Sequence, residues 1–217
     1  MEKIKLENVT LVCVTSVNVE RAINALKYSC RGIDFKEVKL LTDKDISDSK
    51  IIVEKIIPLD LNGYSKFIVY DLYKHINTEF ALIIQDDGFV INPDKWEDEF
   101  LKYDYIGAPW ALPSDNFSYR DPFGNLIRVG NGGFSLRSKK LLSLSTELEL
   151  EWKSYFGFYN EDGFFTCHNR HLFEKEGCKY APLEVAVRFS KEREIEENKG
   201  IITFGFHGKY SKNYFLI

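Results

Sequence analysis

The segment Phe80-Ala81-Leu82-Ile83-Ile84-Gln85-Asp86-Asp87-Gly88-Phe89 decides how this chain can fold. Its first five residues are apolar, and such an uninterrupted run is typical of a strand buried on both faces of a parallel sheet. The run ends abruptly in polar residues and a glycine. Ligands of open α/β sheets bind beyond the carboxyl ends of the strands. The segment therefore predicts a central strand with a site at its end.

The chain before residue 80 predicts a β-α-β-β-α-β order. Short β-branched and apolar runs predict strands, and apolar residues at helical spacing predict helices. We expect strands over residues 9–15, 35–41 and 51–57, and helices over residues 20–30 and 64–76. This order predicts a mostly parallel sheet covered by helices. Thr15 and Ser16 would then lie at the same edge of the sheet as Gln85.

The second half of the chain predicts shorter and less regular elements. We expect helices over residues 96–103, from 138–143 onward and from 161–162 to about 176. We expect strands over residues 134–136 and 185–189, and a strand or turn over 105–110. A hairpin turn is expected over residues 121–128, and an exposed charged helix or loop over 191–199. The sequence has no internal repeat, low-complexity segment or clear linker. A chain of 217 residues therefore predicts one domain.

Composition narrows the classes of function. The chain has 29 Lys and Arg against 33 Asp and Glu, a net charge of −4, which argues against general nucleic-acid binding. It begins without a signal-peptide pattern, and no apolar stretch approaches the ~20 residues of a membrane span. The four cysteines show no CxxC spacing, which favours a reducing, cytoplasmic compartment. The aromatic content of 15% indicates mainly core packing.

Asp86 and Asp87 are the strongest local candidates for chemistry. Adjacent carboxylates at the end of a buried strand are costly unless a cation or hydrogen-bond donors neutralise them. Mg²⁺ and Mn²⁺ bind carboxylate oxygens and leave coordination positions for substrate phosphates. A turn with two capping aspartates is the alternative that this segment leaves open.

Three glycines, Gly130, Gly132 and Gly133, occur within four positions beside a predicted strand. Glycine lets the backbone approach another group closely, and that group is either a ligand or a neighbouring strand. The sequence contains no GxGxxG fingerprint and no Walker A motif, so Rossmann dinucleotide binding and P-loop chemistry are not supported.

Several further positions have two interpretations each. Glu161 and Asp162 begin a predicted helix, where a carboxylate is either an N-cap or a general base toward a hydroxyl. His207 is either a structural histidine or a nitrogen ligand that completes a metal site begun at the end of the central strand. Cys167, His168 and His171 lie close together, and Cys167 and His171 share a helical face, but a zinc site would need a fourth ligand from elsewhere.

Six segments occur in an order that resembles a known family. They are QDDGFVINPDKW (85–96), YDYIGAPW (103–110), VGNGGFSLRS (129–138), NEDGFF (160–165), APLEVAVRFSKE (181–192) and FGFHG (204–208). From about Thr10 to His207, the chain resembles a family of little-characterised glycosyltransferase-like domains of bacteria, fungi and large viruses. That family is similar to the GT-A class of nucleotide-sugar transferases. The resemblance implies an α/β fold with a Rossmann-like, mostly parallel central sheet flanked by helices, and a smaller irregular β region on the acceptor side.

The resemblance also implies a single domain, residues 1–217, with two functional halves. About residues 1–90 would bind the nucleotide, and about residues 91–217 would supply the acceptor and catalytic side. The GT-A class usually has a DxD-type motif that holds Mn²⁺ or Mg²⁺ on the donor diphosphate. The matching tripeptide is Gln85-Asp86-Asp87, in which Gln85 departs from the motif. Asp87 is then the best metal ligand, and His207 matches the histidine that often completes the site.

Further roles follow from the same resemblance. Thr15, Ser16, Gln85, Asp86, Gly132 and Gly133 would bind the donor. Asp162 would act as the base and Glu161 as a ligand of the acceptor hydroxyl, although these two roles are exchangeable. Aromatic residues within the motifs would offer faces for a sugar: Phe89, Tyr105, Trp110, Phe134, Tyr159, Phe164 and Phe206.

The implied function is transfer of a sugar from a nucleotide-sugar donor, UDP-linked by analogy with the class, to a hydroxyl of a glycan, lipid-linked or protein acceptor. Direct displacement with inversion and assistance by a divalent metal would be expected. One alternative is a degenerate domain that only binds a carbohydrate or nucleotide. Another is a sugar nucleotidyltransferase, which usually carries a glycine-rich, basic loop after its first strand, whereas residues 14–18 contain no such loop.

Overall fold

The computed structural model of the protein describes residues 3–153 and 160–208. Its centre is a six-stranded sheet in the order β3-β2-β1-β4-β7-β6. The strands are β1 (Ile4–Val14), β2 (Ile33–Thr42), β3 (Ile52–Lys55), β4 (Phe80–Ile84), β6 (Tyr105–Gly107) and β7 (Phe134–Ser138). Strand β7 is antiparallel to its neighbours β4 and β6, and the other pairs are parallel. The predicted mostly parallel sheet is confirmed.

A second, three-stranded sheet lies beside the end of β4. It consists of β5 (Gly88–Val90), β8 (Ser190–Lys191) and β9 (Gly205–His207), in the order β5-β9-β8. Strand β5 follows β4 after a short turn, and β9 pairs with it in antiparallel register, with Gly88 opposite His207. This pairing brings His207 to the turn that carries Gln85, Asp86 and Asp87.

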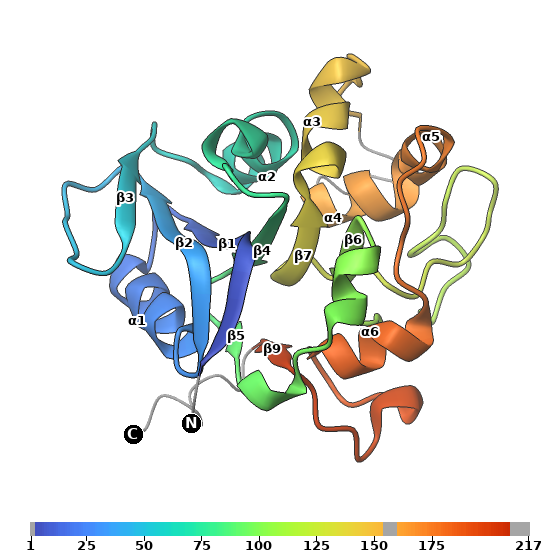
Figure 1. The fold of residues 1–217 in the computed structure, drawn as a ribbon. Helices are drawn as coiled ribbons and strands as arrows, with labels where there is room; N and C mark the ends of the chain where they lie inside the picture. Colours follow the sequence, from blue (N-terminus) through green and yellow to red (C-terminus); the bar gives the residue numbers. More distant parts are fainter. Residues whose placement is uncertain (1–2, 154–159, 209–217) are drawn as a thin grey trace.

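Helices cover both faces of the six-stranded sheet (Figure 1). The α-helices are α1 (Val19–Ser29), α2 (Leu61–Tyr70), α3 (Lys139–Glu147), α4 (Glu161–Gly163), α5 (Arg170–Lys175) and α6 (Leu183–Phe189). The other helical elements of the described residues are short turns. Those of 3₁₀ type are η1 (Leu72–His75), η2 (Pro93–Lys95), η3 (Asp98–Lys102) and η5 (Glu196–Asn198). The π-helical turn is η4 (Phe164–His168). Helices α1 and α6 pack into one buried cluster, and α2, α3 and α5 pack into another.

Successive residues of β4 contribute to these two different clusters. Leu82 and Ile84 belong to the cluster that contains α1, and Ala81 and Ile83 belong to the cluster that contains α2. Side chains alternate between the two faces of a strand. Every position of β4 is apolar because both faces are covered, which is the arrangement predicted from the uninterrupted run.

One predicted strand is wrong, because residues 185–189 belong to helix α6. Val185 and Val187 are β-branched and alternate with other residues, which favours a strand locally. In the structure, Val185, Ala186 and Phe189 pack against the core at helical spacing. Tertiary packing therefore outweighs the local preference.

Two predicted helices differ in form from the structure. Residues 96–103 contain the 3₁₀ turn η3 instead of an α-helix. The helix expected from residues 161–162 to about 176 is divided into α4, η4 and α5, with a break at Asn169. Gly177 follows α5 with φ +80°, as expected for a residue that ends a helix.

Aromatic rings fill the core between the sheet and α6. Phe100, Phe134, Phe189 and Phe204 are fully buried. The ring centroids of Phe100 and Phe189 are 5.2 Å apart, and those of Phe134 and Phe189 are 5.3 Å apart. Such tilted and edge-to-face pairs contribute about 0.5–1.5 kcal/mol each beyond the area they bury. Much of the aromatic content is therefore core packing, as the composition predicts.

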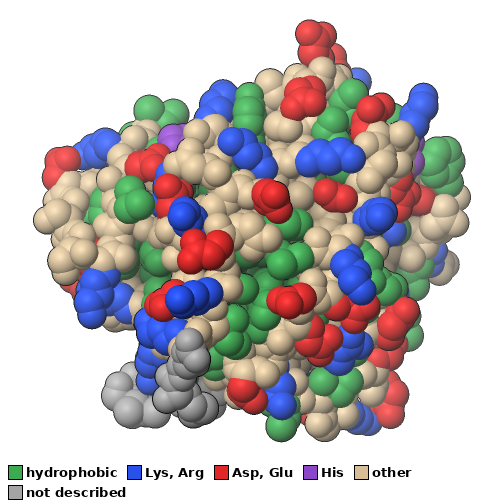
Figure 2. Space-filling view, viewed as in Figure 1, with side chains coloured by type: hydrophobic (Ala, Val, Ile, Leu, Met, Phe, Trp, Pro, Cys, Tyr) green, Lys and Arg blue, Asp and Glu red, His purple; other side chains and the backbone are tan. Residues whose placement is uncertain are grey.

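Acidic and basic side chains are interspersed on the face shown in Figure 2. This face therefore has no continuous patch of positive charge, which a nucleic-acid-binding surface requires. Among the helices of residues 3–153 and 160–208, none combines the length and the apolar character needed to cross a membrane.

Candidate active site

A cavity of about 270 Å³ lies at the carboxyl ends of β1 and β4, and we call it the donor-side cavity. It is lined by Val14, Thr15, Ser16, Val17, Leu59, Asp60, Leu61, Tyr64, Gln85 and Asp86. Four residues predicted to bind a donor, Thr15, Ser16, Gln85 and Asp86, therefore share one cavity. Their roles in binding stay predictions.

Two hydroxyl groups hold the wall of this cavity in place. The Ser16 hydroxyl accepts a hydrogen bond of 2.8 Å from the backbone N–H of Leu59, which precedes α2. The Thr15 hydroxyl accepts one of 3.1 Å from the backbone N–H of Val17. The first bond ties the turn after β1 to the chain that enters α2, and the second stabilises that turn itself, so Ser16 and Thr15 shape the cavity.

Asp86 lies beside a cation that sequence reasoning missed. Arg21 of α1 places its Nη1 3.3 Å from Asp86 Oδ2. The Arg21 side chain is 48% exposed, so this ion pair adds little to stability. Its guanidinium nevertheless brings a fixed positive charge to the edge of the donor-side cavity, where phosphate oxygens would benefit from it.

Asp87 and His207 meet next to the donor-side cavity. His207 Nε2 lies 3.2 Å from Asp87 Oδ1 and 3.2 Å from Gln85 Oε1. Burial alone would raise the pKa of Asp87, but the hydrogen bond from His207 and its charge outweigh burial and lower that pKa. Burial alone would lower the pKa of His207, but Asp87 outweighs burial and raises it. Each group thus favours the charged form of the other.

The Asp87–His207 pair also fits a divalent metal. An octahedral ion with ligands at about 2.1 Å holds adjacent ligand atoms about 3 Å apart, close to the 3.2 Å between the two donor atoms here. The carboxylate oxygen and the Gln85 amide oxygen suit Mn²⁺ and Mg²⁺, and the imidazole nitrogen is poorly suited to Mg²⁺, so Mn²⁺ is the better fit of the two. In the described ranges, no three His, Cys, Asp or Glu side chains form a metal-binding group, so such an ion would take its remaining ligands from substrate and water.

The clustered glycines face protein side chains of the site. An added Cβ at Gly133 would lie 2.1 Å from His207 Nε2, and one at Gly132 would lie 2.3 Å from Glu161 Oε1. At Gly130 it would lie 2.2 Å from the Trp110 ring. The groups that approach these glycines closely are thus side chains from distant parts of the chain. Whether Gly132 and Gly133 also contact a donor stays a prediction.

Glu161 lies in a buried ion pair. Its Oε1 is 3.1 Å from Nη2 of Arg137, a side chain of β7 with no exposed surface. The Arg137 guanidinium also donates to Ser135 and lies over the rings of Tyr105 and Phe165. Glu161 is absent from the lining of the cavities described at this edge of the sheet, so its carboxylate serves Arg137 in this structure.

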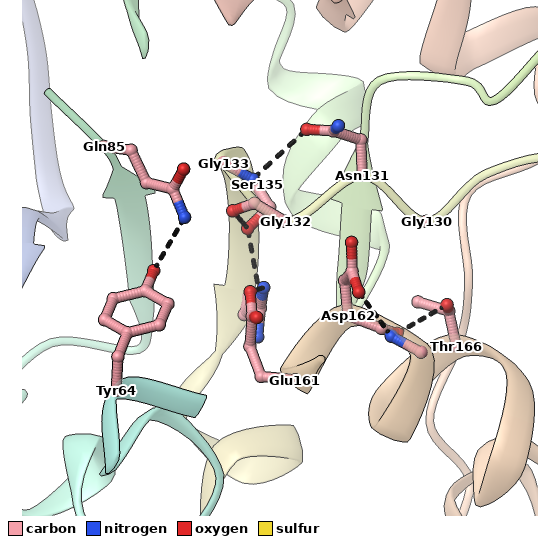
Figure 3. A network of polar contacts seen from close by, with 12 residues as sticks. Tyr64, Gln85, Gly130, Asn131, Gly132, Gly133, Ser135, Glu161, Asp162 and Thr166 are labelled. Carbon is pink, nitrogen blue, oxygen red and sulfur yellow. Dashed lines mark hydrogen bonds and ion pairs between the residues drawn. The ribbon is translucent and has the colours of Figure 1, made fainter. Parts of the chain in front are cut away.

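Asp162 occupies the next position of α4 and faces a different environment (Figure 3). Burial, helped by the negative charge of Glu161, raises the pKa of Asp162 to about 7. Asp162 Oδ1 accepts a 2.7 Å hydrogen bond from the backbone N–H of Gly163. A carboxylate whose pKa lies near neutrality is suited to accept a proton from a hydroxyl group.

Asp162 lines a second cavity, of about 290 Å³, which we call the acceptor-side cavity. Its lining comprises Trp110, Phe117, Ser118, Tyr119, Arg120, Asn131, Asn160, Asp162, Gly163, Cys167, His168, Glu192 and Arg193. In Figure 3, Gln85 and Tyr64 lie on one side of the Gly132–Gly133 segment, and Asp162 lies on the other. The two cavities therefore flank one shared strand end.

Sequence reasoning missed several residues of the acceptor-side cavity. Glu192 and Arg193 belong to the charged run predicted as an exposed helix or loop, and Tyr119 lies in an irregular connection with no motif. The lining residues that fall in the motif segments are Trp110, Asn131, Asn160, Asp162, Gly163 and Glu192.

The proposal that motif aromatics face a sugar is wrong for five of them. Phe89, Tyr105, Phe134, Phe164 and Phe206 are buried in the core and have no face open to a ligand. Trp110 lines the acceptor-side cavity. Tyr159 lies outside the described residues.

Two solved structures similar to this one are glycosyltransferases. The galactosyltransferase LgtC, solved in complex with donor and acceptor sugar analogs, is 14% identical, with 92% of this chain and 86% of that chain covered and a TM-score of 0.58. A glycosyltransferase involved in glycosylation of the major capsid of PBCV-1 is 12% identical, with 94% and 95% covered and a TM-score of 0.56. At such identities the likeness shows the GT-A fold.

Comparison with curated proteins gives no match. The family model described as "Protein of unknown function (DUF5672)" matches residues 51–207, most of the chain and all but the first of the segments that form the site. The chain therefore belongs to the DUF5672 family.

Proposed function

We propose that this protein is a glycosyltransferase that moves a sugar from a nucleotide-sugar donor to an acceptor hydroxyl. One observation carries the proposal: two cavities flank the Gly132–Gly133 segment, with a metal-compatible pair, Asp87 and His207, beside one and a carboxylate of raised pKa, Asp162, in the other. Sugar transfer needs both a way to stabilise a leaving diphosphate and a base for the attacking hydroxyl. The GT-A fold supports the same reaction class.

The donor would occupy the donor-side cavity with its diphosphate directed toward Asp87. The nucleoside would lie against Thr15, Ser16 and Tyr64, and Arg21 would add positive charge near the phosphates. The fold class favours uridine diphosphate as the carrier. Because the acceptor-side cavity begins beyond Gly132, the sugar would lie between the two cavities.

Asp87 and His207 would hold Mn²⁺ or Mg²⁺, with the Gln85 amide oxygen beside them. The bound ion would supply positive charge that stabilises the leaving diphosphate. Gln85, unlike a carboxylate, brings no negative charge to this group of ligands. Asp87 is therefore the principal anionic ligand.

Asp162 would accept the proton of the acceptor hydroxyl while its oxygen attacks the anomeric carbon and the diphosphate leaves. Attack from the side opposite the leaving group inverts the configuration at that carbon. We assign Glu161 a positioning role in place of direct contact with the acceptor, since its carboxylate is paired with Arg137. The pair fixes the start of α4 and with it Asp162.

Residues 1–217 would act as one domain, with the donor held mainly by about residues 1–90 and the acceptor by about residues 91–217. All four cysteines, Cys13, Cys30, Cys167 and Cys178, are free. Free thiols are compatible with a reducing compartment such as the cytoplasm, where we place the protein.

A thermal-shift screen of nucleotide sugars with and without Mn²⁺ tests the proposal. Specific binding raises the melting temperature by mass action, and we expect the largest rise with a UDP-sugar in the presence of Mn²⁺. Asp87→Ala should abolish the Mn²⁺-dependent part. The matched control is Asp45→Ala, since Asp45 is exposed and lies outside both cavities. If no nucleotide sugar raises the melting temperature, the proposal is wrong.

Hydrolysis of the bound donor then separates a transferase from a domain that only binds. Gln85, in place of an acidic residue, is the observation that favours the binding-only alternative. Slow release of free sugar from the donor by the wild-type protein would support a transferase. Donor binding without any hydrolysis or transfer would favour the alternative. The anomeric configuration of the released sugar, followed by NMR, tests inversion.

A further inference from the structure

We propose that the acceptor-side cavity binds an uncharged sugar ring, so that the acceptor is a glycan, and that Tyr119 supports one face of that ring. The proposal rests on the proposed function for the reaction, but it concerns the chemical class of the acceptor. Three features of the cavity carry it: an aromatic wall, a balanced set of charges and a preformed loop.

The aromatic wall is built on Trp110. Its ring packs against Gly130, where an added Cβ would lie 2.2 Å away, so Trp110 is only 7% exposed. The Tyr119 ring stacks on it, with centroids 4.4 Å apart and planes 16° from parallel. Trp110 thus supports Tyr119, and Tyr119 and Phe117 both line the cavity. A flat aromatic wall suits the C–H face of a sugar ring.

The backbone of Tyr119 adopts an unusual conformation to hold this position. Its φ is +54°, in the left-handed region that bulky residues rarely occupy. Strained residues of this kind cluster at functional sites. The strain here places an aromatic ring on the wall of the cavity that Asp162 also lines.

The charged groups of the cavity balance one another. Asp162 and Glu192 are the acidic residues, and Arg120 and Arg193 are the basic ones. Arg120 donates hydrogen bonds of 2.8 Å to the backbone carbonyls of Asn116 and Gly124, so its guanidinium is committed to the loop.

Arg193 has a carboxylate beside it, with its Nε 3.9 Å from Glu192 Oε2. Burial also lowers the pKa of His168, which favours a neutral ring at the cavity wall. A phosphate or carboxylate ligand would meet no unbalanced positive charge in this cavity, whereas a neutral polyhydroxyl ligand meets amide, carboxylate and guanidinium groups. Asn131 and Asn160 add amides to that polar lining.

The loop that carries Tyr119, residues 111–128, is held by its own hydrogen bonds, and we call it the acceptor loop. Asp115 accepts from the backbone N–H groups of Phe117 at 2.9 Å and Ser118 at 2.6 Å. Asp121 accepts from those of Phe123 at 2.9 Å and Asn125 at 2.8 Å. A preformed loop lowers the entropic cost of binding a small ligand.

The size of the cavity indicates one ring. Its volume of about 290 Å³ lies at the lower end of the range for small-molecule sites, about 300–1,000 Å³. One sugar unit would therefore occupy the cavity, and the rest of a glycan would extend past the acceptor loop.

Titration with neutral methyl glycosides of glucose, galactose and mannose, followed by saturation-transfer NMR with and without UDP and Mn²⁺, tests the proposal. At least one glycoside should bind. Tyr119→Ala should weaken its binding about tenfold, the size of a lost aromatic contact, and Tyr119→Phe should bind as wild type does. The matched control is Phe123→Ala, since Phe123 is 71% exposed on the same loop and does not line the cavity.

The proposal is overturned if no glycoside binds, or if Tyr119→Ala binds the glycoside as tightly as wild type with an unchanged melting temperature. Binding of glucose 6-phosphate or of a serine peptide, in the absence of glycoside binding, would assign the cavity to another class of acceptor. Donor binding and hydrolysis are measured on the same preparations. Donor hydrolysis without glycoside binding would refute the acceptor class alone, and glycoside binding without donor binding would refute the transferase alone.

Discussion

His207 lies against Gly133 so closely that its Nε2 occupies the place of any side chain at that position, with an added Cβ only 2.1 Å away. Residue 133 precedes β7 and residue 207 ends β9, so two different sheets meet at this contact. Position 133 must be glycine because His207 fills the space of any side chain there, and His207 is also the proposed metal ligand.

Gly133→Ala should therefore displace His207. The added methyl group must move the imidazole ring or the backbone, and overpacking of this kind costs about 1–3 kcal/mol. We expect lower stability in urea unfolding and loss of the Mn²⁺-dependent thermal shift.

A double-mutant cycle with His207→Ala supplies the control. Once the ring is absent, the methyl group at position 133 has space, so Gly133→Ala should cost much less stability in that background. An equal cost in both backgrounds would contradict the contact with His207 as the cause.

Asp162 should make the protein less stable as the pH rises. Its pKa is about 7 in the folded protein and about 3.9 in an unfolded chain, so between these values the folded state holds a proton that the unfolded state has released. Stability then falls as the pH rises from about 4 to about 7.

Asp162→Asn removes this penalty. The variant should melt at a higher temperature than wild type at pH 8 and near the wild-type temperature at pH 4, while transfer activity falls by about 10²–10⁴-fold, the range of a lost general base. Thermal melts at the two pH values and a transfer assay check both statements. A variant that transfers sugar at the wild-type rate would refute the assignment of the base.

Arg137→Met should destabilise the protein strongly. It leaves the Glu161 carboxylate buried without its cation, and breaking a buried ion pair costs about 3–5 kcal/mol. The comparison is Arg170→Met, which breaks the more exposed pair with Glu174 and should cost less than about 1 kcal/mol. Urea unfolding measures both, and similar costs would contradict the structural role of Arg137.

Mn²⁺ binding should strengthen with pH through the titration of His207. The raised pKa of His207 means that the ion pair with Asp87 stabilises the fold below about pH 6.5 and that this contribution is lost as the pH rises through the folded pKa. The lowered pKa of Asp87 limits the contribution at the acidic end, where it is lost as that carboxylate is protonated.

A metal ion needs the neutral imidazole, so it competes with the proton. We expect a larger Mn²⁺-induced rise in melting temperature at pH 8.5 than at pH 6.0. An equal rise at both values, or an unchanged difference in His207→Gln, would contradict His207 as a ligand.

The sheet was predictable because its signals are local. The apolar runs of β4 and of the second half of β1 reflect burial on both faces of the sheet, and the structure confirms both strands. Residues 185–189 show where this reasoning fails. Two valines favour a strand, but the core presents a surface that fits one side of a helix, and a single sequence does not contain that information.

The candidate site could be predicted only at ionisable residues in unusual places. Carboxylates and histidines at strand ends and helix starts are costly to bury without a partner, so they suggest a function. These residues are Asp86, Asp87, Glu161, Asp162 and His207. Tyr119 and Glu192 did not stand out, because their relation to Asp162 arises only when two irregular connections fold over the same helix start. The partner of Glu161 was also hidden, since Arg137 reads as an ordinary residue at the end of a strand.

The pairing of β5 with β9 also has a consequence for biosynthesis. Asp87 and its partner His207 are separated by most of the second half of the chain, and three paired positions bring them together. A ribosome-bound chain that has not yet reached residue 204 contains Asp87 but no β9. The proposed metal site can therefore form only after β9 has been synthesised, so a shorter nascent chain would lack one of the two proposed metal ligands.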